Sequence, residues 1–524
     1  MSRPEALAIL LAVLTVGVAP IAATPTQPPP GPAPTAAPAP STAPTPSAAP
    51  APSGSPAPAG AAALPLAGRL AALLKQPAFN PDETAVVVAI LPEGETIFAR
   101  LAEKPLRPAS TLKIVTSAAA LALLKPEYTY ETRILADAEP DGTGTVQGNL
   151  YLKGSGAPDL VGESWWLMAR RLASQGLRRV TGDLVADESH FDPVRRPSGW
   201  PTPGADSWYN APVGALSCNF NVVTVHVDPS PVSGSRPDIS IEPAASYFQM
   251  LNRATTTNGP STLKVDRFYE NGQNALTITG TIRRGGGPLT FHRAVEEPAL
   301  YAAHAFREIA KREGIVVEGA IVTGIAPESA RELHSHESRP LGLLIRDMNK
   351  NSNNFMAEAI IKTIGAQFIG TPGTTAAGLE VVRTYLTGLG IDLSTTRLAD
   401  GSGLSDETLL PARVLAELLV RSWDDFELGP ELTVSLPIGG ADGTLDERFV
   451  HEDARRHLRA KTGRIASALT LAGYATNRDG RPFAFVIFAN RPRGTIEAVH
   501  RAMDRFLDEL LRASDADLAA VAPS

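Results

Sequence analysis

Both ends of the globular part of this chain predict the same kind of structure, and this constrains the fold most. Residues 84–100, TAVVVAILPEGETIFAR, form two apolar runs around a Pro-Glu-Gly turn, and residues 468–490 form two more around NRDGRP. Each pattern predicts a β-hairpin. Helical patterns follow at residues 110–125 and 496–513. We therefore predict one α/β domain that is split in the sequence by an insertion.

The region between the two ends, residues 129–340, has a different pattern. Its clearest features are short apolar runs bounded by Gly and Pro turns, which predict strands at residues 221–227, 275–282 and 316–324. Helical signals resume at residues 341–350, 353–365 and 376–390. We expect residues 64–128 and 341–514 to form the split domain, and residues 129–340 to form an inserted β-rich module of two nested domains. A chain of 524 residues is longer than one hydrophobic core usually serves.

The N-terminal residues predict an export signal followed by a spacer. Arg3 precedes the apolar run LAILLAVLTVGVAPIAA, so residues 1–23 are predicted to be a signal peptide cleaved after Ala23. An uncleaved anchor or a core helix stays open for this segment. Residues 24–63 are almost entirely Pro, Ala, Ser, Thr and Gly and predict a disordered linker. Residues 515–524 are predicted to be a disordered tail. The expected location is the periplasm, the cell wall or the extracellular space, with peripheral or no membrane association.

Charge and short motifs exclude several classes of function. The formal net charge is −7, so there is no basic footprint for nucleic acid. Cys218 is the only cysteine, which rules out an intramolecular disulfide, and we interpret it as a small buried hydrophobe. No metal site or cofactor is expected. HEDARRH (451–457) has Arg455 where a His-Glu-x-x-His zinc helix needs histidine, and HSH (334–336) has no visible partner cluster.

The sequence Ser-Thr-Leu-Lys occurs twice, at residues 110–113 and 261–264. Residues i and i+3 share one face of a helix, so Ser110 and Lys113 at the start of a helix would meet. On a strand, residues i and i+3 point to opposite faces. The second copy lies between turn signals in the β-rich region, so Ser261 and Lys264 are not expected to pair. We therefore interpret Ser261 as a surface serine and Ser110 as a candidate nucleophile.

Two further motifs support the first copy. Ser352-Asn353-Asn354 and Lys461-Thr462-Gly463 follow Ser110 in the order of the S-x-x-K, S-x-N and K-T-G signature of serine acyl-transferases. Lys113 could activate Ser110 as a base if burial and nearby positive charge lower its pKa. Lys461 could supply that charge and, with Thr462, bind a substrate carboxylate.

The remaining motif residues have roles that follow from the same chemistry. Ser352 can relay a proton to the leaving amine, while Asn354 can bind a substrate amide or orient the base. An oxyanion needs two fixed donors. We predict that these are the backbone N–H groups of Ser110 and Arg464. Gly463 would allow a substrate backbone to approach the strand edge closely.

The spacing and several longer stretches resemble one known family. Ser352 lies 352 − 110 = 242 residues after Ser110, far more than a compact β-lactamase-like domain needs. Together with GNLYLKGSGAPDL (148–160), ALSCNFNVVTV (215–225), ADGSGLS (399–405) and LPIGGADGTLDERF (436–449), this pattern is similar to the low-molecular-mass class C penicillin-binding proteins, the D-alanyl-D-alanine carboxypeptidase/endopeptidase family. The resemblance covers residues 64–513.

The resemblance implies a fold and an activity. The fold is an antiparallel sheet flanked by helices, as in penicillin-binding and β-lactamase-like domains. The activity is serine-type hydrolysis of the terminal D-Ala-D-Ala bond of peptidoglycan stem peptides, extending to D-Ala–diaminopimelate cross-links, through an acyl-enzyme at Ser110. The enzyme would be acylated by penicillins, and its oligomeric state stays open.

Two departures from the family pattern and two alternatives remain. GSGAPDL (154–160) replaces the usual Gly-Asp-Pro run, and Arg464 stands where the family often has a small residue, which leaves the leaving-group preference open. One alternative is a β-lactamase, which the large insertion disfavours. The other is a catalytically silent, peptidoglycan-binding wall protein, which the intact motifs disfavour.

Overall fold

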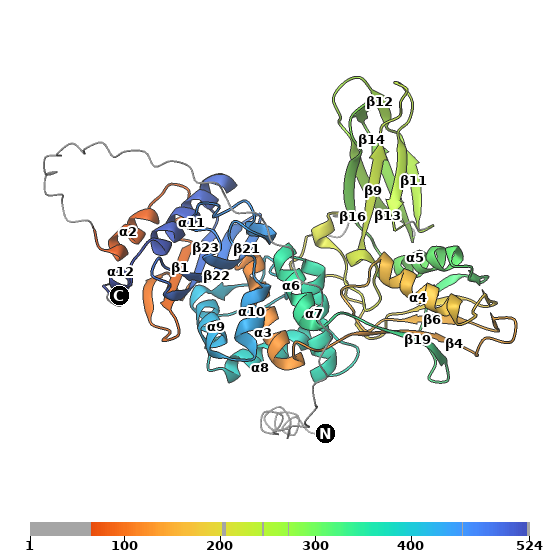
Figure 1. Cartoon of the computed structure of the whole chain (residues 1–524), viewed down its shortest axis with the longest axis horizontal. Coiled ribbons are helices and arrows are strands. Elements are labelled where there is room, and N and C mark those ends of the chain that lie inside the picture. Colours follow the sequence, from red (N-terminus) through yellow and green to blue (C-terminus); the bar gives the residue numbers. More distant parts are fainter. Residues whose placement is uncertain (1–63, 202–205, 244–245, 271, 453, 521–524) are drawn as a thin grey trace, which may run out of the picture. The chain divides into compact units, whose positions relative to one another are not determined.

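The structure, a computed structural model, describes residues 64–201, 206–243, 246–270, 272–452 and 454–520 (Figure 1). The predicted signal peptide and linker lie outside these residues. Within the described ranges, no helix combines the length and the apolar character needed to cross a bilayer.

A five-stranded antiparallel sheet joins strands from both ends of the chain. Its order is β2-β1-β23-β22-β21. The strands are β1 (Thr84–Ile90), β2 (Thr96–Arg100), β21 (Leu458–Ile465), β22 (Ala468–Thr476) and β23 (Pro482–Asn490). The two predicted hairpins are confirmed, and β1 pairs with β23 along its whole length. The sheet therefore places β21, which carries the Lys-Thr-Gly motif, at one edge.

Helices cover both faces of this sheet (Figure 1), as the expected fold class requires. Val86 and Val88 of β1 belong to a core that includes α2 (Leu66–Leu73) and α11 (Ile496–Leu511). Ala85 and Val87, which point to the opposite face, join a second core with α3 (Lys113–Leu124) and α9 (Ala412–Asp424). Because both faces are covered, every residue of β1 is buried and its sequence is a continuous apolar run.

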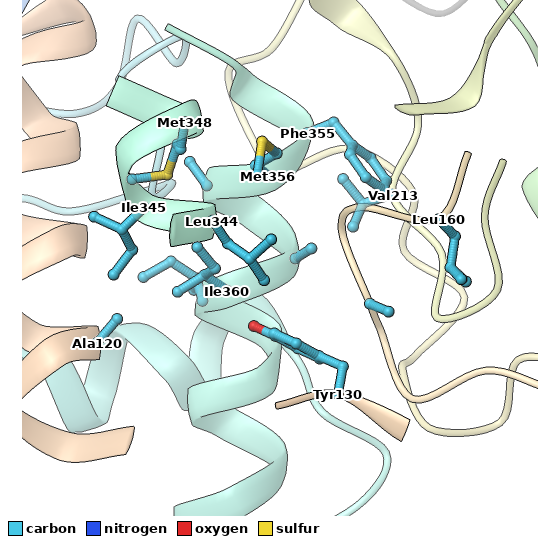
Figure 2. Packing of buried hydrophobic residues seen from close by; sticks show 14 of the residues in the cluster. Ala120, Tyr130, Leu160, Val213, Leu344, Ile345, Met348, Phe355, Met356 and Ile360 are labelled. Carbon is cyan, nitrogen blue, oxygen red and sulfur yellow. The ribbon is translucent and has the colours of Figure 1, made fainter. Parts of the chain in front are cut away.

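The second core holds together the helices that carry the other two motifs. These are α3, α6 (Leu341–Asn351) and α7 (Asn354–Phe368). Figure 2 labels members of this core from all three helices: Ala120 of α3, then Leu344, Ile345 and Met348 of α6, and Phe355, Met356 and Ile360 of α7. Tyr130, Leu160 and Val213, from the region after α3, belong to the same core. Residues 113–121 of α3 are all buried, which confirms the prediction of a buried helix.

Two further helices lie in the second half of the chain, α8 (Thr375–Gly388) and α10 (Leu428–Ser435). Short 3-10 turns occur at η2 (Ala109–Leu112), before α3, and at η5 (Gly443–Leu445), before β21. The turn η2 contains Ser110, and η5 contains Thr444.

Residues 129–340 form several small sheets. One has the order β18-β8-β6-β4-β19, from β4 (Glu131–Ala136), β6 (Leu150–Lys153), β8 (Leu184–Asp187), β18 (Ile321–Thr323) and β19 (Arg331–Glu337). Others are β10-β9-β16, from β9 (Val222–Asp228), β10 (Asp238–Glu242) and β16 (Leu289–Ala294), and β11-β14-β13, from β11 (Phe248–Asn252), β13 (Lys264–Glu270) and β14 (Gln273–Thr279). The predicted β-rich character is confirmed, but α4 (Gly162–Ser174) and α5 (Pro298–Arg312) were not predicted. The division into two nested domains stays a prediction.

The predicted disordered tail begins too early. Residues 515–519 form α12 (Asp515–Ala519), so the prediction is wrong for these residues. The Ser514 hydroxyl accepts a hydrogen bond from the Asp517 N–H, and the Asp517 carboxylate accepts one from the Ser514 N–H, which is a capping box. Leu518 is buried in the same core as α2 and α11, so the short helix also gains apolar burial.

Candidate active site

Ser110 lies in a tight turn just before α3. The turn η2 continues directly into that helix, so Ser110 and Lys113 fall one turn apart. Ala109 has φ of 45°, a left-handed conformation that is unusual for a residue with a side chain. Thr111 and Thr470 both donate hydroxyl hydrogen bonds to the Pro108 carbonyl, at 2.5 and 2.8 Å. These hydrogen bonds therefore hold the backbone before Ser110 in its unusual conformation.

Lys113 is fully buried and its amino group contacts the candidate nucleophile. Its Nζ donates to Ser110 Oγ at 3.1 Å, to Asn354 Oδ1 at 2.6 Å and to the Ser402 carbonyl at 2.8 Å. Burial lowers the pKa of Lys113 to about 7, although the carboxyl groups of Asp400 and Glu358 act to raise it. Near neutral pH a large share of Lys113 is therefore the neutral amine, which can accept a proton.

The two carboxyl groups behind Lys113 are residues that the sequence analysis did not identify. Glu358 Oε1 accepts hydrogen bonds from the N–H groups of Gly401 and Ser402, at 2.9 and 2.8 Å. Burial, followed by the nearby Asp400, raises the pKa of Glu358 to about 8. Glu358 thus holds the loop whose Ser402 carbonyl contacts Lys113. Glu358 is four residues after Asn354, one helical turn, but nothing in a single sequence marks it as different from an exposed glutamate.

Ser352 and Lys461 form a second hydrogen-bonded pair. Ser352 ends α6 in the left-handed conformation, with φ of 54°, and its hydroxyl accepts a hydrogen bond from Lys461 Nζ at 2.8 Å. Lys461 also donates to the Thr462 carbonyl at 2.7 Å and is fully buried. Burial, and then the charge of Lys113, lower the pKa of Lys461 well below its usual range. The expectation that Lys461 lowers the pKa of Lys113 needs correction, because burial is what lowers the pKa of Lys113.

Asn354, the first residue of α7, joins Lys113 to the inserted region. Its Oδ1 accepts from Lys113 and its Nδ2 donates to the Tyr209 carbonyl at 2.9 Å. Asn353 precedes it and caps the helix by accepting from the Met356 N–H. Of the two predicted roles for Asn354, orienting Lys113 is the one visible in this geometry. Tyr209 was missed because it is 354 − 209 = 145 residues away in the sequence.

The Lys-Thr-Gly strand lies directly against the turn of Ser110. A Cβ added at Gly463 would lie 2.8 Å from the Ser110 nitrogen and 3.0 Å from Ala109 Cβ, so any larger residue would push the strand away. Thr462 donates a hydroxyl hydrogen bond to Thr444 Oγ at 2.7 Å. Arg464 follows on the same edge strand with an exposed side chain. The eight predicted site residues are thus gathered from η2, α3, α6, α7 and β21.

The second Ser-Thr-Leu-Lys copy is not part of this site. Ser261 is exposed in the loop before β13, where its hydroxyl accepts a hydrogen bond from the Arg283 N–H at 3.0 Å. Lys264 is the exposed first residue of β13. Cys218 is buried, as expected, and burial raises the pKa of its thiol. No set of three or more His, Cys, Asp or Glu side chains suited to a metal ion occurs in the part of the chain that the structure describes.

Comparison with known proteins identifies the family. Residues 66–510 match the D-Ala-D-Ala carboxypeptidase 3 (S13) family. The chain belongs to this family. A D-alanyl-D-alanine carboxypeptidase from Actinomadura sp. (strain R39) is 34% identical over 438 residues, which cover 81% of this chain and 80% of the relative. The D-alanyl-D-alanine carboxypeptidase DacB of Haemophilus influenzae is 28% identical over 387 residues, covering 73% of this chain and 80% of the relative.

Solved structures show the same fold. Penicillin binding protein 4 (dacB) from H. influenzae matches 85% of this carboxypeptidase and 99% of its own chain, with a TM-score of 0.74 and 24% identity. The same protein was also solved in complex with a β-lactam, with a TM-score of 0.69. The predicted family, fold class and D-Ala-D-Ala carboxypeptidase activity are therefore confirmed, and a β-lactamase or a silent wall protein is disfavoured.

Proposed function

We propose that this carboxypeptidase forms an acyl-enzyme at Ser110, with Lys113 as the base that activates it. The observation that carries the proposal is the position of Lys113 Nζ, buried and 3.1 Å from Ser110 Oγ, with a pKa near 7. In its neutral form, the Lys113 amine takes the hydroxyl proton as Ser110 Oγ bonds to the carbonyl carbon of the substrate's penultimate D-Ala. Asn354 and the Ser402 carbonyl hold the amine in place for this step.

The tetrahedral intermediate then needs charge stabilisation and a proton for the leaving amine. We assign the oxyanion to the backbone N–H groups of Ser110 and Arg464, which the close packing of Gly463 on the Ser110 turn supports. Ser352, hydrogen-bonded to Lys461, donates its hydroxyl proton to the departing D-Ala nitrogen and is reprotonated from the protonated Lys113 or from Lys461. The C–N bond breaks, free D-Ala leaves, and water later hydrolyses the ester at Ser110.

The natural substrates we propose are the stem peptides of peptidoglycan that end in D-Ala-D-Ala, together with D-Ala–diaminopimelate cross-links. In a β-lactam, the ring amide takes the place of the scissile D-Ala-D-Ala amide. Ser110 can therefore attack its carbonyl carbon and open the ring. The complex of H. influenzae penicillin binding protein 4 with a β-lactam supports the same behaviour in this chain. These substrates are consistent with the export signal predicted for residues 1–23 and with a location outside the cytoplasmic membrane.

Labelling with a fluorescent penicillin tests the proposal. The wild-type protein should form one stable adduct, which mass spectrometry locates at Ser110, and Ser110→Ala should abolish it. Ser261→Ala is the matched control, since the same motif there lies on an exposed loop, and it should label normally. An adduct at any other residue, or none, would refute the assignment. Release of D-Ala from a stem pentapeptide, compared with cleavage of a cross-linked dimer, then separates carboxypeptidase from endopeptidase activity.

A further inference from the structure

The hydroxyl of Thr462 has a hydrogen-bond acceptor within the protein. It donates its proton to Thr444 Oγ at 2.7 Å. The Thr444 hydroxyl keeps its own proton, for which no acceptor exists among the described residues, and the side chain is exposed. Thr444 therefore presents, next to the Lys-Thr-Gly strand, an O–H donor that no acceptor of the described residues engages.

We propose that Thr444 is a substrate-binding residue whose hydroxyl donates a hydrogen bond to the C-terminal carboxylate of the substrate. Thr462 then acts behind it, through the chain Thr462 O–H to Thr444 Oγ and Thr444 O–H to carboxylate. Hydrogen bonds to a charged acceptor are about twice as strong as neutral ones, and a chain of such bonds polarises each member. The inference rests on the proposed function, because it concerns the leaving D-Ala of the same reaction.

The position of Thr444 is fixed by the helix that also carries Ser352. Lys350 Nζ donates to both carboxylate oxygens of Asp442, at 2.8 and 2.7 Å, and to the Leu436 carbonyl at 2.7 Å. The Asp442 carboxylate also accepts from the Ile438 N–H at 2.7 Å. Although burial acts to raise the pKa of Asp442, the hydrogen bond from Lys350 lowers it, so the Asp442 carboxylate is ionised at neutral pH.

Close backbone packing adds to this attachment. Gly443 has φ of 59°, and a Cβ there would lie 2.8 Å from the Lys350 carbonyl oxygen. The turn η5, which contains Thr444, is thus packed directly on the end of α6, two residues before Ser352. A hydroxyl held by an ion pair and by backbone contact is preorganised, which is what recognition of a small anionic group requires.

A pair of thioesters tests the inference, because thioesters are reactive enough to acylate the enzyme without a carboxylate. One is a peptidyl-D-alanyl thioglycolate, whose leaving group carries the carboxylate, and the other is the matching ethyl thioester. Thr444→Val should lower kcat/KM for the thioglycolate at least about tenfold and change kcat/KM for the ethyl thioester less than about twofold. Thr444→Ser, which keeps the hydroxyl, should stay within about threefold of wild type on both.

Matched controls separate the possible outcomes. Thr395→Val makes the same change at an exposed turn and should leave both rates unchanged. Equal losses on both thioesters in Thr444→Val would show a structural role and overturn the inference, as would an unchanged rate on the thioglycolate. Failure of the wild-type protein itself to turn over either thioester, or to be labelled at Ser110 by penicillin, would instead overturn the proposed function.

Discussion

Replacing Gly463 by alanine should slow acylation of Ser110. The added Cβ would lie 2.8 Å from the Ser110 nitrogen and 2.1 Å from Thr470 Oγ, whose hydroxyl holds the Pro108 carbonyl. Reaching an ordinary contact of 3.4 Å requires a shift of 3.4 − 2.8 = 0.6 Å between the strand and the nucleophile. A misplacement of about 1 Å can cost about 100-fold in rate, so 0.6 Å predicts a loss of roughly 10- to 20-fold.

The assay is the second-order rate of labelling by a fluorescent penicillin, measured beside the thermal melting curve. Gly388→Ala is the matched control, because Gly388 lies in α8 with nothing within 4 Å of an added Cβ. That variant should label at the wild-type rate and gain up to about 1 kcal/mol of stability from helix propensity. A Gly463→Ala protein that melts as wild type and labels within about twofold of its rate would refute the requirement for close approach.

Two further predictions concern pH. Only neutral Lys113 can accept the Ser110 proton, and its pKa is about 7. The rate of penicillin acylation should therefore fall about fivefold from pH 7 to pH 6 and about tenfold per pH unit below that. A rate that is flat from pH 5 to pH 8 would contradict the assignment of Lys113 as base. The pKa of Glu358 is raised to about 8, so folding favours its protonated form. The stability that this form contributes is fully present below pH 4.5, the usual pKa of glutamate, and is lost as the pH rises through 8. Glu358→Gln cannot ionise and should therefore show a smaller drop in melting temperature between pH 5 and pH 8.5 than the wild type, as followed by circular dichroism; an equal drop in both proteins would assign the loss to other groups.

Much of the site could be predicted because its residue types are required by the chemistry. A serine and a lysine three residues apart meet on a helical turn but not on an extended strand, and this separated Ser110 from Ser261, which the structure places in an exposed loop. The hairpins at both ends of the chain were also readable, since strands with two covered faces are continuous apolar runs around turn residues. The order of the three motifs then connected these segments to one family.

Other parts of the site depend on contacts between distant segments. Glu358 and Asp400 surround Lys113 only after α7 and the loop after α8 have packed together, and Tyr209 reaches Asn354 from the inserted region. Thr444 likewise gains its position from an ion pair between Lys350 and Asp442, which are 92 residues apart. These residues are chemically ordinary in the sequence, so no local pattern distinguishes them from surface positions.

The pKa values show the same division between local pattern and tertiary structure. From the sequence, the lowered pKa of Lys113 was attributed to burial together with a nearby positive charge, for which Lys461 was the candidate. In the folded protein, complete burial of Lys113 is the main cause, and the neighbouring carboxyl groups oppose it. The sequence by itself determined which side chains can take part in the reaction, because the motifs specify their chemical type and their spacing along the chain. Only the tertiary structure decided how those side chains are tuned and held, because burial, charge and close packing arise from segments that meet only in the folded chain.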